Sequence, residues 1–250
     1  GQRHALKLHG PNTAVRVGGA YMPAGTPGGT PVEPGRETCP ETRWVTVNDN
    51  LVKGGDLSNW SVSMGPQDSI SDERVSHVVY ERNHHLGGPA SLVDVETSAS
   101  QVMIRNNAFD ATLDRYYTGV YVHRRGIEPV PAGYRVLHNT IYKESANLDT
   151  AAVDFGAEVT DAVVRNNLLA VQAGGTVRAT VGGGGAGWAA DHNLVTTTAT
   201  LADPAAGDFT LLAGSPAVDA GAALWDASTD YFGQARPLGA GPDAGAVESR

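Results

Sequence analysis

One short pattern recurs six times along the chain, and it constrains the fold more than any other feature. Each copy is an apolar run, partly β-branched, that ends at an asparagine and continues into a second short apolar pair. The copies are WVTVNDNLV, HVVYERNHH, QVMIRNNAF, YRVLHNTIY, AVVRNNLLA and WAADHNLVT, aligned on Asn50, Asn83, Asn107, Asn139, Asn167 and Asn193. By subtraction, the steps between these asparagines are 33, 24, 32, 28 and 26 residues, so the period is irregular but bounded.

Each copy predicts a strand, a bend and a second strand. Asparagine suits the bend because it tolerates the left-handed backbone conformation and because its amide can bond nearby backbone groups. Asparagines stacked at the same bend in successive turns can also bond one another along the axis of a solenoid. The repeated asparagine therefore favours a fold in which the chain winds.

A second set of strand-like runs lies between these copies. The runs cover residues 4–10, 60–66, 91–97, 119–125, 151–157 and 176–182. Each turn of the chain is thus expected to hold at least two strands and a bend, the pattern of a parallel β-helix of about six coils. A β-sandwich would show hairpin turns every 8–12 residues or so, and a propeller four strands in each repeat of about 40 residues. Few Asn-Gly or Asp-Gly hairpin signals occur, so the β-helix is favoured.

Composition and charge narrow the class of protein. Hydrophobic residues make up 41% of the chain and charged residues 18%, which is typical of a globular protein. The formal net charge of −9 sets aside a general nucleic-acid binder, which would be basic. No run approaches about 18 apolar residues, so no membrane span is expected.

The coils with Asn-Asn before an apolar pair resemble right-handed parallel β-helix proteins of the pectate-lyase-like group. The segments GDFTLLAGSPAVDAG (207–221) and DYFGQARPLGAGPDAGAVE (230–248) are similar to a terminal segment common on bacterial secreted β-helix proteins. The resemblance implies a right-handed helix and a bacterial protein that is secreted or held at the cell surface. It implies no particular reaction, because this fold hosts lyases, hydrolases, epimerases and adhesins.

The chain is expected to be one domain, with coils over residues 1–200 and a capping segment over residues 201–250. A solenoid must cover its last open coil. Four residues of the segment are interpreted as a structural set, with the arginine as partner of a carboxylate: Asp219, Asp230, Arg236 and Asp243. The chain opens on GQRHALKLHG with no similar cap, so we expect upstream coils to be supplied by a preceding fragment or by another chain.

Alternation splits the second set of runs into inner and outer positions. The inner positions are all apolar: Leu6, Leu8, Val62, Met64, Val93, Val95, Val120, Val122, Val153 and Phe155. Coils stacked about 4.8 Å apart would bring the outer positions into a row on one face. The row holds Lys7 with His9, Ser63, Asp94, His123, Asp154 and Arg178. Such a row is either a solvated face with charges balanced between coils, or a groove that binds a linear polysaccharide.

As a groove, the row favours a polysaccharide lyase that acts by β-elimination on a uronate-containing polymer. That reaction needs a base and a cation. His123 is the first candidate for the base because its ordinary pKa lies near working pH, and Lys7 or Tyr121 could replace it. The uronate carboxylate would pair with a cationic side chain of Arg124, Arg125 or Arg178. His9 and Ser63 would complete the substrate-binding surface.

Three acidic residues on or beside the row form a candidate site for Ca²⁺, which prefers oxygen ligands: Asp94, Glu96 and Asp154. No cofactor is indicated besides this ion. Asp94 and Asp154 are also the carboxylates of an alternative, an inverting glycoside hydrolase. Two coils apart, their backbones would be separated by roughly 9–10 Å, near the upper end of the inverting range of about 6.5–9.5 Å. A further alternative is a non-catalytic β-helix that binds glycans or is structural at a cell surface. His84 and His85 follow a bend and are interpreted as a loop pair.

Overall fold

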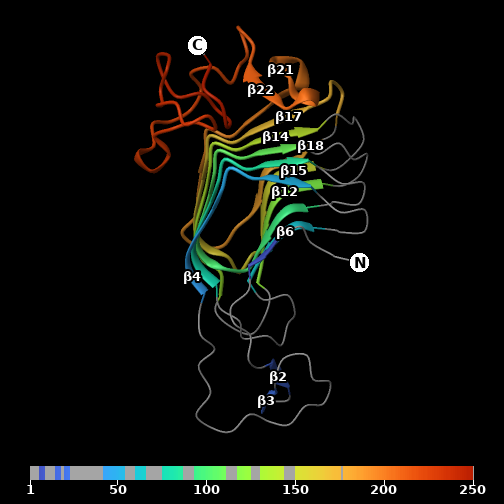
Figure 1. Ribbon diagram of the computed structural model, residues 1–250, viewed down its shortest axis with the longest axis vertical. Helices are drawn as coiled ribbons and strands as arrows, with labels where there is room; N and C mark the ends of the chain where they lie inside the picture. Colours follow the sequence, from blue (N-terminus) through green and yellow to red (C-terminus); the bar gives the residue numbers. More distant parts are fainter. Residues whose placement is uncertain are drawn as a thin grey trace.

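The described residues wind into an all-β parallel β-helix (Figure 1). The structure, a computed structural model, describes residues 6–8, 15–17, 20–22, 42–53, 60–65, 75–86, 93–110, 117–124, 130–143, 150–175 and 177–249. The predicted fold class is confirmed. Within the described ranges, no helix has the length and the apolar character needed to cross a bilayer.

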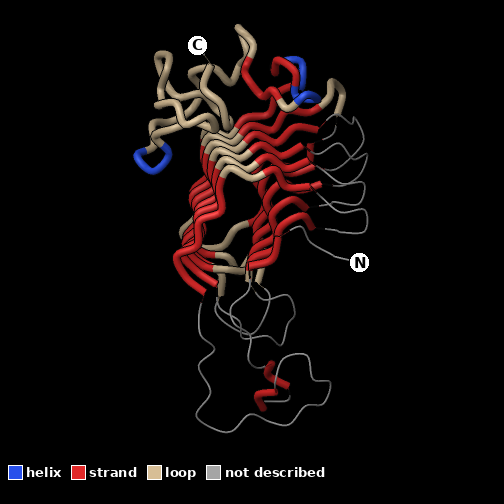
Figure 2. Tube along the Cα trace, in the orientation of Figure 1, coloured by secondary structure: helices blue, strands red, loops and turns tan. Residues whose placement is uncertain are grey.

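Strands of the described residues stack into three six-stranded sheets, visible as red stacks in Figure 2. The first sheet has the order β1 (Leu6–Leu8), β6 (Trp60–Met64), β9 (Val93–Thr97), β12 (Tyr117–Val122), β15 (Thr150–Phe155) and β18 (Val177–Gly183). The second has β4 (Thr42–Asn48), β7 (Val75–Glu81), β10 (Ser100–Arg105), β13 (Ala132–Leu137), β16 (Thr160–Arg165) and β19 (Ala189–Asp191). The third has β5 (Leu51–Lys53), β8 (His84–Leu86), β11 (Ala108–Asp110), β14 (Thr140–Lys143), β17 (Leu168–Val171) and β20 (Leu194–Thr197). The chain visits the three sheets in turn.

Smaller elements complete the described secondary structure. β2 (Val15–Val17) pairs antiparallel with β3 (Ala20–Met22), and β21 (Leu201–Asp203) pairs antiparallel with β22 (Asp208–Leu211). Single 3₁₀ turns cover Thr198–Thr200, Pro204–Ala206 and Trp225–Ala227.

Both sets of runs take the places expected from the sequence. Each run of the second set overlaps one strand of the first sheet, and each asparagine-bearing copy supplies a strand of the second sheet, a bend and a strand of the third. The strands pair in parallel, for example Val62 with Val95 and Val120 with Val153. The predicted inner residues whose side chains are described are buried, among them Met64, Val122 and Phe155. Alternation therefore identified the core of the first sheet.

The His84–His85 prediction was wrong. Both residues lie in β8, and His85 is fully buried inside the coils, with its Nε2 atom 2.7 Å from the hydroxyl oxygen of Tyr80. Its ring meets Phe109 edge to face at 4.7 Å. Because the hydrogen bond to Tyr80 satisfies a polar atom, a histidine is accommodated at an inward position of the strand.

The aligned asparagines bond one another along the axis, as predicted. The side-chain Nδ2 of Asn107 donates to Oδ1 of Asn139 over 2.9 Å, and Nδ2 of Asn139 donates to Oδ1 of Asn167 over 2.9 Å. Each of these Oδ1 atoms also accepts the backbone N–H of the preceding asparagine, at 3.0 Å in both cases. The same pattern runs through Asn50, Asn83, Asn107, Asn139, Asn167 and Asn193, which we call the ladder asparagines.

The left-handed backbone at the bend does not belong to the ladder asparagine, which corrects our expectation. It belongs to the residue before it, with φ between 50° and 60° at Asp49, Arg82, Asn106, His138, Asn166 and His192. The two halves of an Asn-Asn pair thus have different tasks. The second asparagine bonds along the axis, and the first tolerates the left-handed conformation. Asparagine is favoured at both places for separate reasons.

The tail, residues 201–249, lies along the outer side of the coils (orange to red in Figure 1). Its apolar residues pack with outward side chains of the third sheet in one cluster that includes Phe209, Ala217, Val247, Tyr142 and Leu168. Its polar contacts reach the bends of successive coils. Thr229 O accepts from Nδ2 of Asn106, Asp243 O lies 3.1 Å from Nδ1 of His138, and Ala222 O accepts from Nδ2 of Asn166. The left-handed residues therefore present their side chains to the tail.

The expected structural set within the tail is confirmed in its contacts. Arg236 pairs with the carboxylate of Glu248, and their side chains are 2% and 0% exposed. Asp230 Oδ1 accepts the backbone N–H groups of Phe232 and Gln234, and Asp243 Oδ1 accepts that of Asp219. Carboxylates that accept backbone N–H groups fix loops which have no sheet to hold them.

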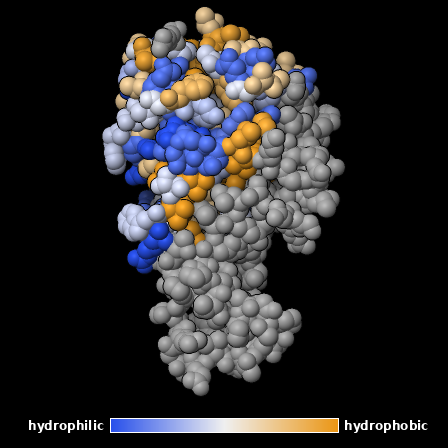
Figure 3. Space-filling view, viewed as in Figure 1, coloured by the Kyte–Doolittle hydropathy of each residue, from blue (hydrophilic) through white to orange (hydrophobic). Residues whose placement is uncertain are grey.

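Figure 3 shows a hydrophilic patch beside a hydrophobic strip on the face turned to the viewer. At one bend, Arg82 bonds Asp49 of the preceding coil with Nε–Oδ1 at 2.8 Å. In the third sheet, Leu51 is exposed.

Stability of the fold is expected to fall as pH drops below about 6.5, and His138 contributes to this loss. Burial, helped by the charge of Arg236, holds the pKa of His138 well below its ordinary value, while hydrogen bonds to the backbone of Asp243 and Gly245 oppose the shift. In the unfolded chain this side chain binds a proton with a pKa near 6.5, whereas in the folded chain it stays neutral at that pH. Stability due to the neutral ring is present above that pH and is lost progressively below it.

Denaturant unfolding of the wild type and of His138→Asn from pH 8 to pH 5 tests this expectation. Asparagine tolerates the left-handed backbone at position 138 and carries no titrating proton. The difference in free energy of unfolding between the two proteins should shift in favour of the variant as the pH falls. A difference that stays constant with pH would contradict it.

Candidate functional site

The register of the first sheet aligns one residue from each strand in a row, in which the side chains of Ser63 and Glu96 are buried and those of Tyr121 and Asp154 are partly exposed. The row, which we call the outer row, runs Lys7, Ser63, Glu96, Tyr121, Asp154 and Gly182. Lys7, Ser63 and Asp154 hold the places predicted for them. Glu96 and Tyr121 take the places predicted for Asp94 and His123. Alternation fixes the face of a strand but not its register, so a shift of two residues leaves the pattern unchanged.

His123 nevertheless contacts the outer row. It follows the end of β12, and its backbone N–H donates to Thr97 O over 3.1 Å. Its Nε2 atom lies 2.6 Å from Oε1 of Glu96, on the neighbouring coil. The Glu96 side chain is 1% exposed and that of His123 is 15% exposed. The parallel stacking thus brings together two ionisable groups separated by 27 residues.

Two further contacts hold this pair in place. The ring of Tyr121 stacks on that of His123, with centroids 4.4 Å apart and an angle of 16° between the planes. The backbone N–H of Arg124 donates to Oε1 of Glu158 over 2.7 Å. That hydrogen bond lowers the pKa of Glu158, and the charges of His123 and Arg124 lower it further. Glu158 is therefore a stable anion on the side of His123 where β15 lies.

The contact with Glu96 gives His123 a defined chemistry. An ionised carboxylate only accepts hydrogen bonds, so Nε2 of His123 is the donor in this pair. In a neutral ring the lone pair is then on Nδ1, the nitrogen that can take a proton from a substrate. A carboxylate in this position also stabilises the imidazolium once it forms. We call this contact the Glu96–His123 pair.

Other residues expected at the site are less defined. Lys7 in β1, Asp94 in β9 and Arg178 in β18 have described backbones only, and His9 and Arg125 lie outside the described residues. Arg178 was predicted on the same row as Asp154, which is wrong. Asp154 pairs with Gly182, and Arg178 lies at the start of β18, where the register shifts. Such an irregularity cannot be recognised from alternation.

The expected Ca²⁺ ligands are not brought together in the described part of the chain. Glu96 bonds His123, and Tyr121 separates Glu96 from Asp154 in the outer row. Among described side chains, no group of three His, Cys, Asp or Glu residues is placed to hold a metal ion. The side chain of Asp94 is outside this set.

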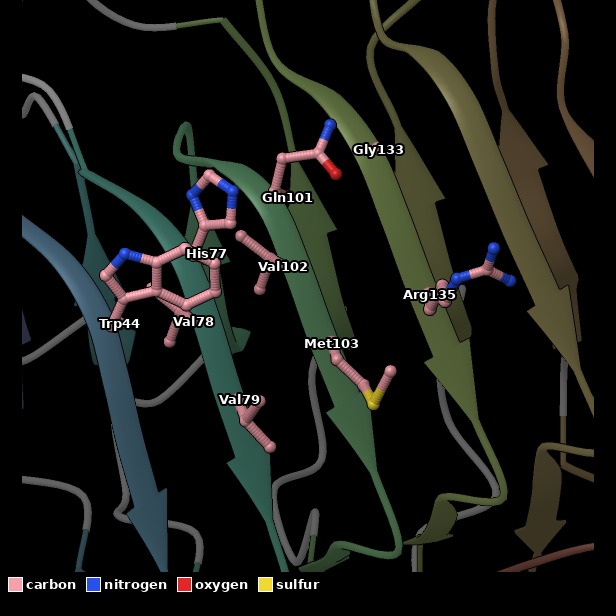
Figure 4. A pocket seen from close by; sticks show the side chains of 9 residues that line it. All are labelled: Trp44, His77, Val78, Val79, Gln101, Val102, Met103, Gly133 and Arg135. Atoms are coloured by element: carbon pink, nitrogen blue, oxygen red, sulfur yellow. The ribbon is translucent and has the colours of Figure 1, made fainter. Parts of the chain in front are cut away.

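A second candidate site, missed at the sequence level, lies on the outer face of the second sheet (Figure 4). It encloses about 220 Å³ and is lined by Trp44, His77, Val78, Val79, Gln101, Val102, Met103, Gly133 and Arg135. We call it the Trp44 groove. Trp44 is 77% exposed, and its ring centroid lies 4.2 Å from that of His77 with 38° between the planes.

One end of the Trp44 groove follows a column of left-handed residues with φ between 52° and 77°. The column contains Trp44, His77, Gln101, Gly133, Asp161 and Gly187. Each of them lies six positions before a ladder asparagine. Aligning the six copies of the repeat column by column therefore places Trp44 next to His77, and this is the signal in the sequence that could have found the groove.

The comparisons with known proteins give no match: neither a protein-family model, nor a curated protein, nor a solved structure is similar to this chain. The inference about function rests on the chain's own residues.

Proposed function

We propose that this protein cleaves a uronate-containing polysaccharide by β-elimination on the outer face of the first sheet, with His123 as the base. The observation that supports this most is the 2.6 Å contact between His123 Nε2 and the buried carboxylate of Glu96. It provides an oriented imidazole beside a row of residues from successive coils. A row spaced by about 4.8 Å per coil suits a polymer that crosses the strands.

In this reaction, Nδ1 of His123 takes the proton from the carbon next to the uronate carboxyl. The electron pair of that C–H bond becomes the new C=C bond. The C–O bond at the adjacent carbon breaks, and its electrons leave on the glycosidic oxygen. The hydroxyl of Tyr121, whose ring stacks on that of His123, would protonate that oxygen. Glu96 stabilises the imidazolium that results.

The charges around His123 suggest how the polymer would lie. Asp154 and Glu158 are acidic residues on the side of β15, and a uronate carboxylate would be repelled there. Ser63 and Lys7 follow in the opposite direction along the outer row. We therefore expect the uronate carboxylate at the proton-transfer position to face away from β15.

An inverting glycoside hydrolase is the second candidate, because two carboxylates flank Tyr121 in the outer row. In register these are Glu96 and Asp154, in place of the Asp94 and Asp154 pair expected from the sequence. Two coils put their backbones roughly 9–10 Å apart. The contact with His123 occupies one Glu96 oxygen, which favours the lyase.

The lyase is tested by incubating the protein with alginate, pectate and glycosaminoglycans while recording the ultraviolet absorbance of unsaturated products. We expect one of these polymers to give a signal, and His123→Ala to lower the rate by about 10²-fold or more. His192→Asn is the control, because His192 is half-exposed at a bend far along the chain and bonds Asp191. Its rate should equal that of the wild type.

The other outcomes separate the alternatives. New reducing ends without absorbance would indicate the hydrolase. Binding without any cleavage would indicate a non-catalytic glycan-binding protein. A His123→Ala rate equal to the wild-type rate would remove this residue from the mechanism.

A further inference from the structure

We propose that the Trp44 groove is a separate, non-catalytic binding site for one sugar ring of an acidic glycan. The ligand class rests on the proposed function, but the site does not share residues with the Glu96–His123 pair. The indole of Trp44 is the platform on which the sugar ring stacks.

Packing does not explain a tryptophan at position 44. Its side chain is 77% exposed, so little of its apolar surface is buried. Its backbone is left-handed, at φ 60°, a conformation that costs a residue with a side chain roughly 1–2 kcal/mol. Two coils fill the same column with glycine, at Gly133 and Gly187, where this cost vanishes. A large aromatic residue held outward at such a position points to a ligand.

The neighbouring coil extends the aromatic surface. His77 lies beside Trp44, and its Nδ1 atom is 2.8 Å from the hydroxyl oxygen of Ser76. That hydrogen bond and the ring contact both limit rotation of the imidazole. Two rings already fixed in place bind a flat apolar surface at low entropic cost.

Polar groups continue the groove away from the rings (Figure 4). The amide of Gln101 lies directly over Gly133, where an added Cβ would come within 2.2 Å of Nε2. Arg135 follows, with its side chain 45% exposed and one guanidinium nitrogen 3.4 Å from Asp226 Oδ2. The side chains of Val79 and Met103 line the groove and form its apolar floor. The aromatic rings suit the apolar face of a uronate ring, the amide suits its hydroxyls, and the guanidinium suits its carboxylate.

Size and topology favour a sugar over other ligands. The groove measures about 220 Å³, less than the roughly 300–1,000 Å³ of pockets that bury a drug-sized ligand, which suits one ring. A peptide that adds a strand pairs along the edge of a sheet, whereas the groove lies on the face of the sheet, across β4, β7, β10 and β13.

The groove and the Glu96–His123 pair share a corner of the coil. Glu96 is near the end of β9 and Gln101 near the start of β10, with Ser98 and Ala99 between the two strands. Five residues span at most about 18 Å. The two sites therefore lie close together along the chain, on neighbouring sheets of the same coil.

The test uses full-length His123→Ala, which should not consume the ligand. Short oligomers of galacturonate, mannuronate and glucuronate are titrated while the indole N–H signals are recorded by NMR and the affinity by calorimetry. The Trp44 signal should shift with saturation, and Trp44→Gly should weaken binding about tenfold. Glycine fits the left-handed backbone there, so the variant should fold. Phe232→Ala, which removes a 60% exposed aromatic ring of the tail, is the matched control and should bind normally.

Two more variants probe the polar end. Gly133→Ala should displace the Gln101 amide and weaken binding, and Arg135→Gln should reduce the preference for the oligouronate over its carboxyl-reduced form. An unmoved Trp44 signal, or a Trp44→Gly affinity equal to that of the parent, would overturn the proposal. The two proposals can fail separately. If the wild type cleaves the polymer but the Trp44 signal does not shift, only the groove proposal is overturned. If the Trp44 signal shifts but no polymer is cleaved, only the lyase proposal is overturned.

Discussion

Asn139→Ala is expected to lower the free energy of unfolding by on the order of 5 kcal/mol. Asn139 Oδ1 accepts both the backbone N–H and the side-chain Nδ2 of Asn107, and its own Nδ2 donates to Ile104 O. Alanine leaves these three groups without their partner at a fully buried position. Each unsatisfied buried group costs about 1–3 kcal/mol. Because a whole fold is stabilised by about 5–15 kcal/mol, this single change removes a large share.

Asn193→Ala is the matched control for this prediction. Asn193 makes the corresponding bonds, accepting from Asn167 N and Nδ2 and donating to Val164 O, but it is only partly buried. Water can replace its amide, so the loss should be nearer about 1 kcal/mol. Chemical denaturation of both variants gives the comparison. If both variants lose the same free energy of unfolding, burial does not determine how much a ladder asparagine contributes to stability.

Arg236→Met should cost about 3–5 kcal/mol and loosen the tail. The guanidinium bonds the Glu248 carboxylate and donates to Gly245 O and Ala246 O over 2.9 and 2.8 Å. Methionine keeps the apolar stem but leaves a carboxylate with 0% exposure facing no cation. Breaking a buried ion pair from one side is strongly destabilising for this reason. Thermal unfolding and proteolysis of residues 228–249 should both report the change.

Two further variants test whether the buried ion pair of Arg236 causes this loss of stability. Arg236→Met combined with Glu248→Gln removes the unpaired charge and should recover part of the lost stability. Arg82→Met breaks the bidentate pair with Asp49, whose side chains are 22% and 57% exposed, and should cost at most about 1 kcal/mol. An Arg236→Met protein as stable as Arg82→Met would show that the buried pair contributes little.

The winding of the chain could be predicted from the sequence because its signals are local. Alternation marked the inner face of the first sheet, and the six asparagines marked the bends. Alternation could not separate Asp94 from Glu96, since the two are two positions apart on one strand and only pairing with β6 and β12 decides which one enters the outer row. It also gave no sign of the burial of His85, because the hydrogen bond to the Tyr80 hydroxyl, five residues earlier, forms only once the bend between β7 and β8 is made.

The candidate sites likewise depend partly on local sequence and partly on how the coils stack. His123 was proposed as a base from its chemistry, but its partner Glu96 follows from the register between two coils. The Trp44 groove was missed because an exposed tryptophan at the start of a strand reads as an ordinary apolar residue. Its left-handed backbone, which turns the ring outward beside His77, is a property of the stacked fold.

The tail ties three consecutive windings to one another. Its residues Ala222, Thr229 and Asp243 contact Asn166, Asn106 and His138, one anchor on each winding. Solenoids commonly gain or lose a winding by duplication or deletion, since each contacts only its neighbours. Here an extra winding between these anchors would displace the later ones by about 4.8 Å, and the closing segment would no longer reach all three. The contacts made by the tail therefore fix the spacing of these windings along the axis.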